Sequence, residues 1–203
     1  MNYLVDEADS ELTLILAHGA GAPMDSQFMQ DVARGVAEAG IRVVRFEFPY
    51  MAERRSGKRR GPDRPAVLVD TWRRVVADHG DANRLVIGGK SMGGRIASMV
   101  ADELNVRGLI ALGYPFHPPG KAEGMRTAHL AGMRTPTLIV QGERDQFGTR
   151  DDVADYELAS TIAIEWMPDG DHSFNARKKS GHSAAENLKT CIERVVAFIR
   201  QLA

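Results

Sequence analysis

The chain has 203 residues and a formal net charge of −1, and 43% of its residues are hydrophobic and 26% are charged. This composition is that of a folded globular domain, and it excludes a disordered chain, a collagen and a disulfide scaffold. Proteins that coat nucleic acid or an anionic membrane carry a basic domain, so the near-neutral charge argues against both partners. We therefore expect a single domain over residues 1–203.

The cysteine count and the N-terminal residues bear on where the protein acts. Cys191 is the only cysteine, and it cannot form an internal disulfide, so no oxidising compartment is required. The sequence has no apolar run of about 18 residues that could span a membrane. The first ten residues carry three acids and no apolar core, unlike a signal peptide. These features predict a cytoplasmic protein and leave its oligomeric state open.

Short apolar runs alternate along the chain with amphipathic segments. Nearly continuous runs of Val, Ile and Leu are typical of strands that are buried on both faces. The predicted strands are Leu12–Ala17, Ile41–Phe48, Leu85–Gly88, Leu109–Leu112, Thr137–Val140 and Ile162–Met167. The predicted helices are Ser26–Ala39, Pro65–His79, Arg95–Leu104 and Ser183–Leu202. This alternation predicts a three-layer α/β/α sandwich around a mostly parallel sheet of about six to seven strands.

Two segments interrupt the alternation, and each follows a strand on the side where such sheets bind ligands. Pro49–Arg64 holds six positive charges within eleven residues, Arg54 to Arg64. Arginine forks could clamp an anionic substrate there, but a solvated, flexible loop explains the same charges and is favoured. Gly113–Thr135 is short for a lipase-like lid, which suggests an open cleft and a small or soluble substrate.

The strongest functional signal is the pentapeptide Gly89-Lys90-Ser91-Met92-Gly93. It matches G-x-S-x-G, and it lies between a predicted strand and a predicted helix, as a nucleophile elbow requires. The glycines allow close packing of strand and helix, and the helix N-terminus behind Ser91 favours developing negative charge. The sequence therefore predicts Ser91 as a nucleophile and the Met92 N–H as an oxyanion donor.

An elbow serine needs a histidine as base and an acid to orient that histidine, in the chain order Ser, Asp or Glu, His. Asp145 follows the strand at 137–140 and is preferred over its neighbours Glu143 and Asp151. His172 follows the last predicted strand and is preferred over His182, which lies near the start of the final helix. We therefore expect Ser91, Asp145 and His172 to form a catalytic triad.

The turn His18-Gly19-Ala20-Gly21 follows the first apolar run. A His-Gly-rich turn at this place supplies the second oxyanion N–H in esterase-like sites. Ala20 is the preferred donor, and Gly19 and Gly21 remain open. His18 precedes the serine in the chain, so we expect it to brace the turn rather than to act as the base. The candidate substrate contacts are Gly19, Gly21, Tyr50, Arg54, Arg55 and Phe116.

The sequence lacks the common metal and nucleotide motifs: it has no H-E-x-x-H, no paired Cys-x-x-Cys and no G-x-G-x-x-G that opens a helix. We therefore expect no metal site and no cofactor.

These motifs together resemble the α/β-hydrolase superfamily over nearly the whole chain. Lys90 in the elbow, the Phe48-Pro49-Tyr50 segment and the arginine-rich loop are similar to a small bacterial group. That group is related to dienelactone-hydrolase-like and testis-expressed hydrolase-like proteins. The resemblance implies a Ser-Asp-His hydrolase without a cap domain. It also implies two antiparallel strands at the start of the chain, which hardly fit into eleven residues.

The favoured hypothesis is a serine hydrolase that cleaves a small carboxylic ester or thioester through an acyl-enzyme. A non-catalytic binding or scaffold protein could keep the same fold, since a fold does not fix a function. An acyltransferase or perhydrolase would use the same triad.

Overall fold

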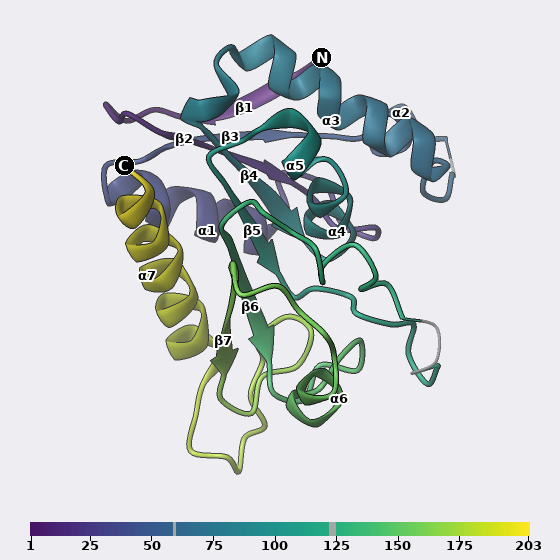
Figure 1. The fold of residues 1–203 in the computed structure, drawn as a ribbon, viewed down its shortest axis with the longest axis vertical. Coiled ribbons are helices and arrows are strands. Elements are labelled where there is room, and N and C mark those ends of the chain that lie inside the picture. Colours follow the sequence, from purple (N-terminus) through teal and green to yellow (C-terminus); the bar gives the residue numbers. More distant parts are fainter. Residues whose placement is uncertain (59, 122–124) are drawn as a thin grey trace.

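The computed structural model describes residues 1–58, 60–121 and 125–203. One sheet contains seven strands in the order β1-β3-β2-β4-β5-β6-β7 (Figure 1). The strands are β1 Tyr3–Asp6, β2 Thr13–Ala17, β3 Arg42–Phe46, β4 Leu85–Lys90, β5 Gly108–Leu112, β6 Thr137–Gly142 and β7 Ile162–Met167. β1 pairs with β3 antiparallel, and all other neighbouring strands are parallel. The predicted, mostly parallel sheet is thereby confirmed.

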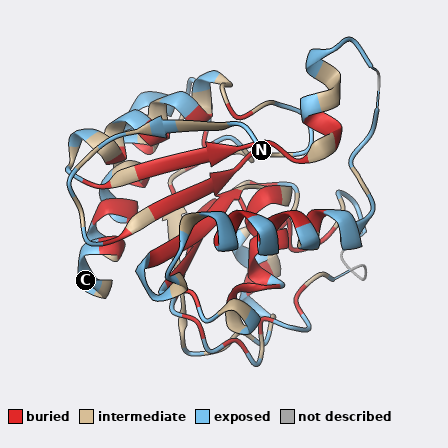
Figure 2. Ribbon diagram, turned by 90° about the horizontal axis from the view of Figure 1, so that it is seen from above, coloured by how far each residue is buried: buried red, intermediate tan, exposed pale blue. Residues whose placement is uncertain are grey.

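Helices cover both faces of the sheet. They are α1 Gln27–Glu38, α2 Pro49–Arg55, α3 Pro65–His79, the 3-10 turn η1 Ala82–Arg84, α4 Met92–Ser98, α5 Ala101–Leu104, α6 Arg150–Ala154 and α7 Ala184–Leu202. α1 and α7 pack on one face, and α3 and α4 pack on the other (Figure 1). The predicted three-layer sandwich is confirmed, with the central strands buried between the helices (Figure 2).

Strand β2 shows how the sequence builds two cores. Ile15 and Ala17 point to the core under α3 and α4, whereas Leu14 and Leu16 point to the core under α1 and α7. This division follows from the alternation of side chains along a strand. All four are fully buried, and each larger side chain contributes about 1.5–3 kcal/mol on burial. The two cores hold the strand ends in place at the edge where the elbow lies.

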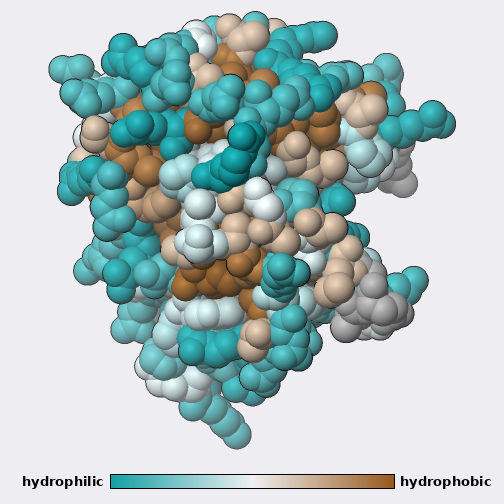
Figure 3. Space-filling view, in the orientation of Figure 1, coloured by the Kyte–Doolittle hydropathy of each residue, from teal (hydrophilic) through white to brown (hydrophobic). Residues whose placement is uncertain are grey.

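Helix ends agree with the sequence at some positions and not at others. Ser183 caps α7 in a reciprocal capping box with Glu186, and α3 spans the predicted residues 65–79. Ser26 occupies the N-cap position of α1 but makes no side-chain cap bond. The surface seen in Figure 3 is mainly hydrophilic, with smaller hydrophobic areas between the charged side chains.

The N-terminal residues and the Pro49–Arg64 segment bear on two expectations from the sequence. The first eleven residues hold one antiparallel strand, β1, which pairs with β3, and not two, as their small number led us to expect. The Pro49–Arg64 segment begins as helix α2 rather than as a flexible loop. Pro49 suits the first turn of a helix, and burial of Tyr50 and Met51 holds that helix against the core.

None of the helices within the described residues combines the length and the apolar character needed to cross a membrane.

Candidate active site

Ser91 lies in a sharp turn between β4 and α4, with φ 50° and ψ −116°. This backbone conformation is rarely adopted by residues other than glycine and costs about 1–3 kcal/mol. The flanking glycines hold the turn against β2. A Cβ atom on Gly89 would lie 2.1 Å from the Ala17 carbonyl oxygen, and one on Gly93 would lie 2.6 Å from that same oxygen. Any side chain there would displace the elbow from its neighbour, so the glycines fix the position of Ser91.

The structure brings Ser91, His172 and Asp145 together from the ends of three strands. His172 Nε2 lies 2.8 Å from Ser91 Oγ, and His172 Nδ1 lies 2.7 Å from Asp145 Oδ2. Both distances are those of hydrogen bonds. An unbroken chain of hydrogen bonds therefore runs from the hydroxyl to the carboxylate, in the geometry that activates a serine.

Asp145 is fully buried, and its carboxylate is held by more than the histidine. Its Oδ1 accepts the Phe147 N–H at 2.9 Å, and its Oδ2 also accepts Gln141 Nε2 at 3.0 Å. A buried carboxylate requires such partners. The acceptor Oδ2 fixes the proton of His172 on Nδ1, which leaves Nε2 free to accept the proton of Ser91. The Phe147 ring lies 4.4 Å from the His172 ring between centroids and limits its tilt.

Lys90 joins the elbow to the histidine segment. Its Nζ donates to the His172 carbonyl oxygen at 2.6 Å and lies over the rings of Phe28 and Phe174. Burial lowers the pKa of Lys90 from about 10.5 to about 8, against the opposing attraction of Asp145 and Asp171. The side chain therefore fixes the backbone of His172 while it keeps a partly desolvated charge.

The stability of the protein is expected to depend on pH through Lys90. Between pH 8 and about 10.5, the unfolded chain keeps the Lys90 proton that the folded chain has released. The free energy of unfolding therefore rises with pH in this window, by up to about 3 kcal/mol. Urea unfolding of the wild type and Lys90→Met, from pH 7 to 10, measures the difference. Parallel pH profiles for the two proteins would contradict this account.

The residues of both candidate oxyanion donors line a cavity together with Ser91. Met92 is the first residue of α4, where backbone N–H groups have no partner within the helix. Gly19 packs against the elbow, since a Cβ atom there would lie 3.7 Å from the Ser91 Cβ. In the described ranges, neither the Met92 nor the Ala20 N–H donates a hydrogen bond. Both groups are therefore free to bind an oxyanion.

Ser91 lies between two cavities, and Ala20 and Phe147 line both of them. The first has a volume of about 410 Å³ and is lined mainly by apolar and small residues together with His172. Gly19 and Gly21 belong to its lining, as predicted for substrate contacts. The second has a volume of about 320 Å³, and its lining includes Arg95 and Arg126.

Four predicted substrate contacts line neither of these two cavities. Tyr50 is fully buried, and its hydroxyl donates to the Ala20 carbonyl oxygen at 3.0 Å, so it supports the turn from behind. Phe116 is a core residue packed on Tyr114 and Tyr156. Its prediction as a substrate contact is wrong, because the chain turns its ring inward under Gly148.

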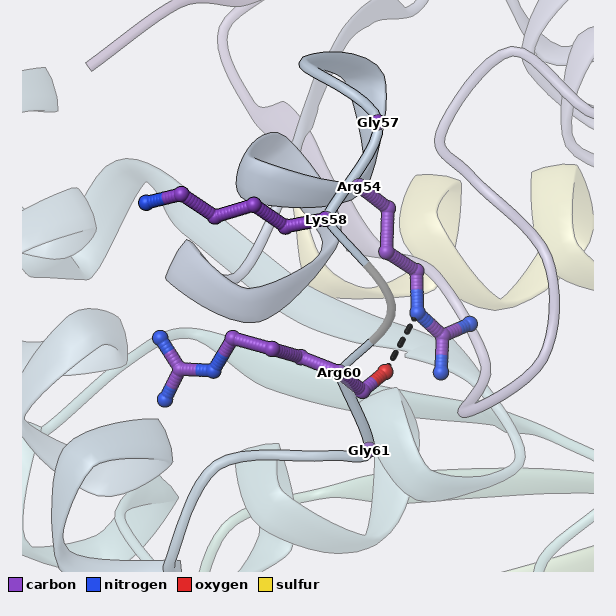
Figure 4. A pocket seen from close by; sticks show the side chains of 5 residues that line it. All are labelled: Arg54, Gly57, Lys58, Arg60 and Gly61. Carbon is purple, nitrogen blue, oxygen red and sulfur yellow. Dashed lines mark hydrogen bonds between the residues drawn. The ribbon is translucent and has the colours of Figure 1, made fainter.

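The arginines of α2 form ion pairs and hydrogen bonds with other residues of the protein. Arg55 pairs with Glu47 and Asp25. Arg54 lies over the Tyr50 ring and donates to the Arg60 carbonyl oxygen at 2.6 Å. Figure 4 shows Arg54 with Lys58 and Arg60 around a separate pocket, whose lining does not include Ser91. Arg59, part of the predicted basic run, lies outside the described residues.

The alternative acids and bases have other partners. Glu143 accepts the Asp169 N–H and pairs with Arg150, and Asp151 lies exposed in the first turn of α6. His18 is fully buried, and its Nε2 accepts the Phe48 N–H at 3.1 Å. His182 is exposed just before α7. Where residues are described, no group of three or more His, Cys, Asp or Glu could hold a metal ion.

Sequence reasoning missed several residues around the site. Gln141 is a polar residue at the end of an apolar strand, and this exception to the apolar pattern could have indicated a residue of the site. The contact of Lys90 with His172 and the positions of Arg95 and Arg126 depend on tertiary structure, so no local pattern could reveal them.

Comparison with known proteins identifies the family. The sequence profile of the family described as alpha/beta hydrolase domain matches residues 10–200. The chain belongs to this family. Among solved structures, this hydrolase is similar to an alpha-beta serine hydrolase homologue from Coxiella burnetii, with a TM-score of 0.69 and 24% identity over 99% of this chain and 91% of that one.

Two further structures resemble the α/β hydrolase. An a/b serine hydrolase without lid from Xanthomonas campestris has a TM-score of 0.68 and 23% identity, over 98% of this chain and 88% of that one. A monoacylglycerol lipase from Paleococcus ferrophilus has a TM-score of 0.72 and 13% identity, over 97% of this chain and 98% of that one. Identities this low show the shared fold alone.

Proposed function

We propose that this α/β hydrolase cleaves a small carboxylic ester or thioester by nucleophilic catalysis. The observation that carries the proposal is the hydrogen-bond chain from Ser91 through His172 to the buried Asp145. It begins at a strained turn and faces a cavity. Strained backbone next to a base and a cavity is the arrangement expected of a nucleophile.

The reaction has two halves in this geometry. Ser91 Oγ attacks the ester carbonyl while His172 Nε2 takes its proton, and the N–H groups of Met92 and Ala20 bind the oxyanion. His172 then donates that proton to the leaving alcohol or thiol, and an acyl-Ser91 ester remains. Water attacks this ester with His172 again as base, which releases the acid and restores Ser91.

Rapid mixing with 4-nitrophenyl acetate tests this proposal. We expect a burst of one 4-nitrophenol per protein when deacylation is slower than acylation, and an acetylated Ser91 peptide in acid-quenched samples. A folded protein that neither turns over nor becomes acetylated would instead be the non-catalytic binding protein. Added alcohol or peroxide separates hydrolysis from acyl transfer or perhydrolysis, because the acceptor appears in the product.

We also propose that the protein acts in the cytoplasm. The free Cys191 is fully buried, and its pKa is raised to about 12 by burial, so the thiol is unreactive. A protein without disulfides that keeps its thiol reduced suits the cytoplasm. The expected partner is a small-molecule substrate.

A further inference from the structure

The second cavity beside Ser91 carries two arginines that the reaction above does not use. Arg95 lies on α4 one turn after Ser91, and its backbone N–H donates to the Ser91 carbonyl oxygen at 3.0 Å. Arg126 follows on another segment, where its N–H donates to the Phe116 carbonyl oxygen at 2.7 Å. Both side chains line the cavity of about 320 Å³ that also contains Ser91 and Met92.

Neither guanidinium is neutralised by an acidic side chain of the described residues. Within residues 1–58, 60–121 and 125–203, neither Arg95 nor Arg126 forms an ion pair, although most other arginines do. The Arg95 Nε is buried and has no hydrogen-bond partner among these residues. A buried donor without a partner costs about 1–3 kcal/mol, and a charged one costs more. An arriving anion would remove that cost.

The two arginines also repel one another. The pKa of Arg126 is lowered by burial and then by the positive charge of Arg95. Two like charges that share one cavity destabilise the empty state, and a negative group placed between them relieves the repulsion. The pair is therefore electrostatically arranged for an anion before any ligand binds.

The two guanidinium groups of the cavity favour a carboxylate. Asp63 also lines the cavity, with Oδ2 accepting the Tyr50 N–H and Oδ1 pairing with Arg60. Because Arg60 pairs with Asp63, the positive charge of the lining that is available to a ligand is that of Arg95 and Arg126. A carboxylate matches the planar guanidinium fork, and its two oxygens can accept hydrogen bonds from both arginines.

The position of His172 decides which part of the substrate reaches the arginines. His172 lines the first cavity and not the second. Since its imidazolium must donate to the leaving oxygen, the leaving group lies in the first cavity. The acyl part then lies in the second, which contains Met92 and the arginines.

We propose that the second cavity binds a carboxylate on the acyl part of the substrate through Arg95 and Arg126. The preferred substrates are then monoesters or monothioesters of short dicarboxylic acids. This inference rests on the proposed function, because it assigns the acyl specificity of the same Ser91 site.

The test compares two esters of matched length, the 4-nitrophenyl monoester of glutaric acid and 4-nitrophenyl pentanoate, with the uncatalysed rates subtracted. For the wild type we expect kcat/KM to be at least about 10-fold higher for the glutarate ester. Arg95→Gln and Arg126→Gln should each lower this value by about 10- to 100-fold. The ratio of the glutarate value to the pentanoate value should fall in the same variants, since the pentanoate chain carries no charge that the arginines could bind.

Three controls separate the explanations. Arg34→Gln removes an exposed arginine of α1, 65% exposed in its side chain, and should leave both substrates unchanged. Arg126→Lys should restore part of the glutarate preference, because charge is retained without the fork. Melting temperatures show whether each variant folds.

Two results would overturn the proposal in distinguishable ways. Equal kcat/KM for the two esters in the wild type would refute the carboxylate subsite and leave the serine hydrolase intact. Failure of a folded wild type to hydrolyse either ester, with no acylation of Ser91, would refute both the hydrolase and the subsite.

Discussion

Replacement of Ser91 by alanine is expected to lower kcat for 4-nitrophenyl ester hydrolysis by about 10⁴- to 10⁶-fold. The Ser91 hydroxyl lies 2.8 Å from His172 Nε2, so its loss removes the proposed nucleophile and not merely a contact. The residual rate would come from a water molecule activated by His172 and bound near the oxyanion donors. The absorbance of 4-nitrophenol, followed by stopped flow for the wild type and in the steady state for the variant, measures both the fast and the residual rate.

The Ser91→Ala result needs a stability control, because Ser91 sits at φ 50°. Alanine and serine both carry a Cβ and bear similar strain there, so the melting temperature should change little. Ser56→Ala, at an exposed serine after α2, is the matched control and should keep full activity. Ser91→Ala with wild-type turnover would rule out Ser91 as nucleophile.

Replacement of Asp145 by asparagine is expected to lower kcat by about 10³- to 10⁴-fold. An asparagine must place its amide nitrogen at one of the two carboxylate positions, and both face donors. At Oδ2 the nitrogen would meet His172 Nδ1 and Gln141 Nε2, and at Oδ1 it would meet the Phe147 N–H. The first orientation reverses the histidine tautomer, and the second leaves two donors opposed in a buried site.

The same substitution should also reduce stability, by about 1–3 kcal/mol, because one buried donor loses its acceptor. Asp151→Asn is the matched control, since Asp151 is exposed at the start of α6. It should leave both kcat and the melting temperature near the wild-type values. Asp145→Asn with unchanged kcat in a folded protein would show that the carboxylate does not orient the base.

The double variant Ser91→Ala, Asp145→Asn extends this test. Asp145 acts on the reaction only through the proton transfer from Ser91 to His172, so its substitution should cost little more once Ser91 is absent. The double variant should therefore be about as slow as Ser91→Ala alone. Losses that multiply would indicate that the two residues act independently.

Much of this structure followed from local patterns in the sequence. The strand at 162–167 and the helix at 65–79 match the observed bounds, because continuous apolar runs and a first-turn proline are strong local signals. The order of Ser91, Asp145 and His172 after three strands placed them at one edge of the sheet, since parallel strands end on the same side.

Other features depended on contacts between distant segments. Phe116 follows a predicted strand and was predicted as a substrate contact, but tertiary packing turns its side chain into the core. Arg54 and Arg55 suggested an anion clamp, but Arg55 forms an ion pair with Glu47, the residue directly after β3. Arg95 and Arg126 are 31 positions apart and share a cavity only in the folded chain. The charge of an arginine does not tell whether an acidic side chain neutralises it or whether it lines a cavity, because the sequence does not show which residues lie beside it in the folded chain.

Covalent labelling tests whether Ser91 is an activated nucleophile, and it requires no knowledge of the natural substrate. Wild type, Ser91→Ala and Asp145→Asn are treated with a fluorophosphonate probe and analysed by peptide mass spectrometry. We expect one adduct on Ser91 of the wild type, none on Ser91→Ala, and much slower labelling of Asp145→Asn. A folded wild type that remains unlabelled, or that is labelled on another residue, would contradict this expectation.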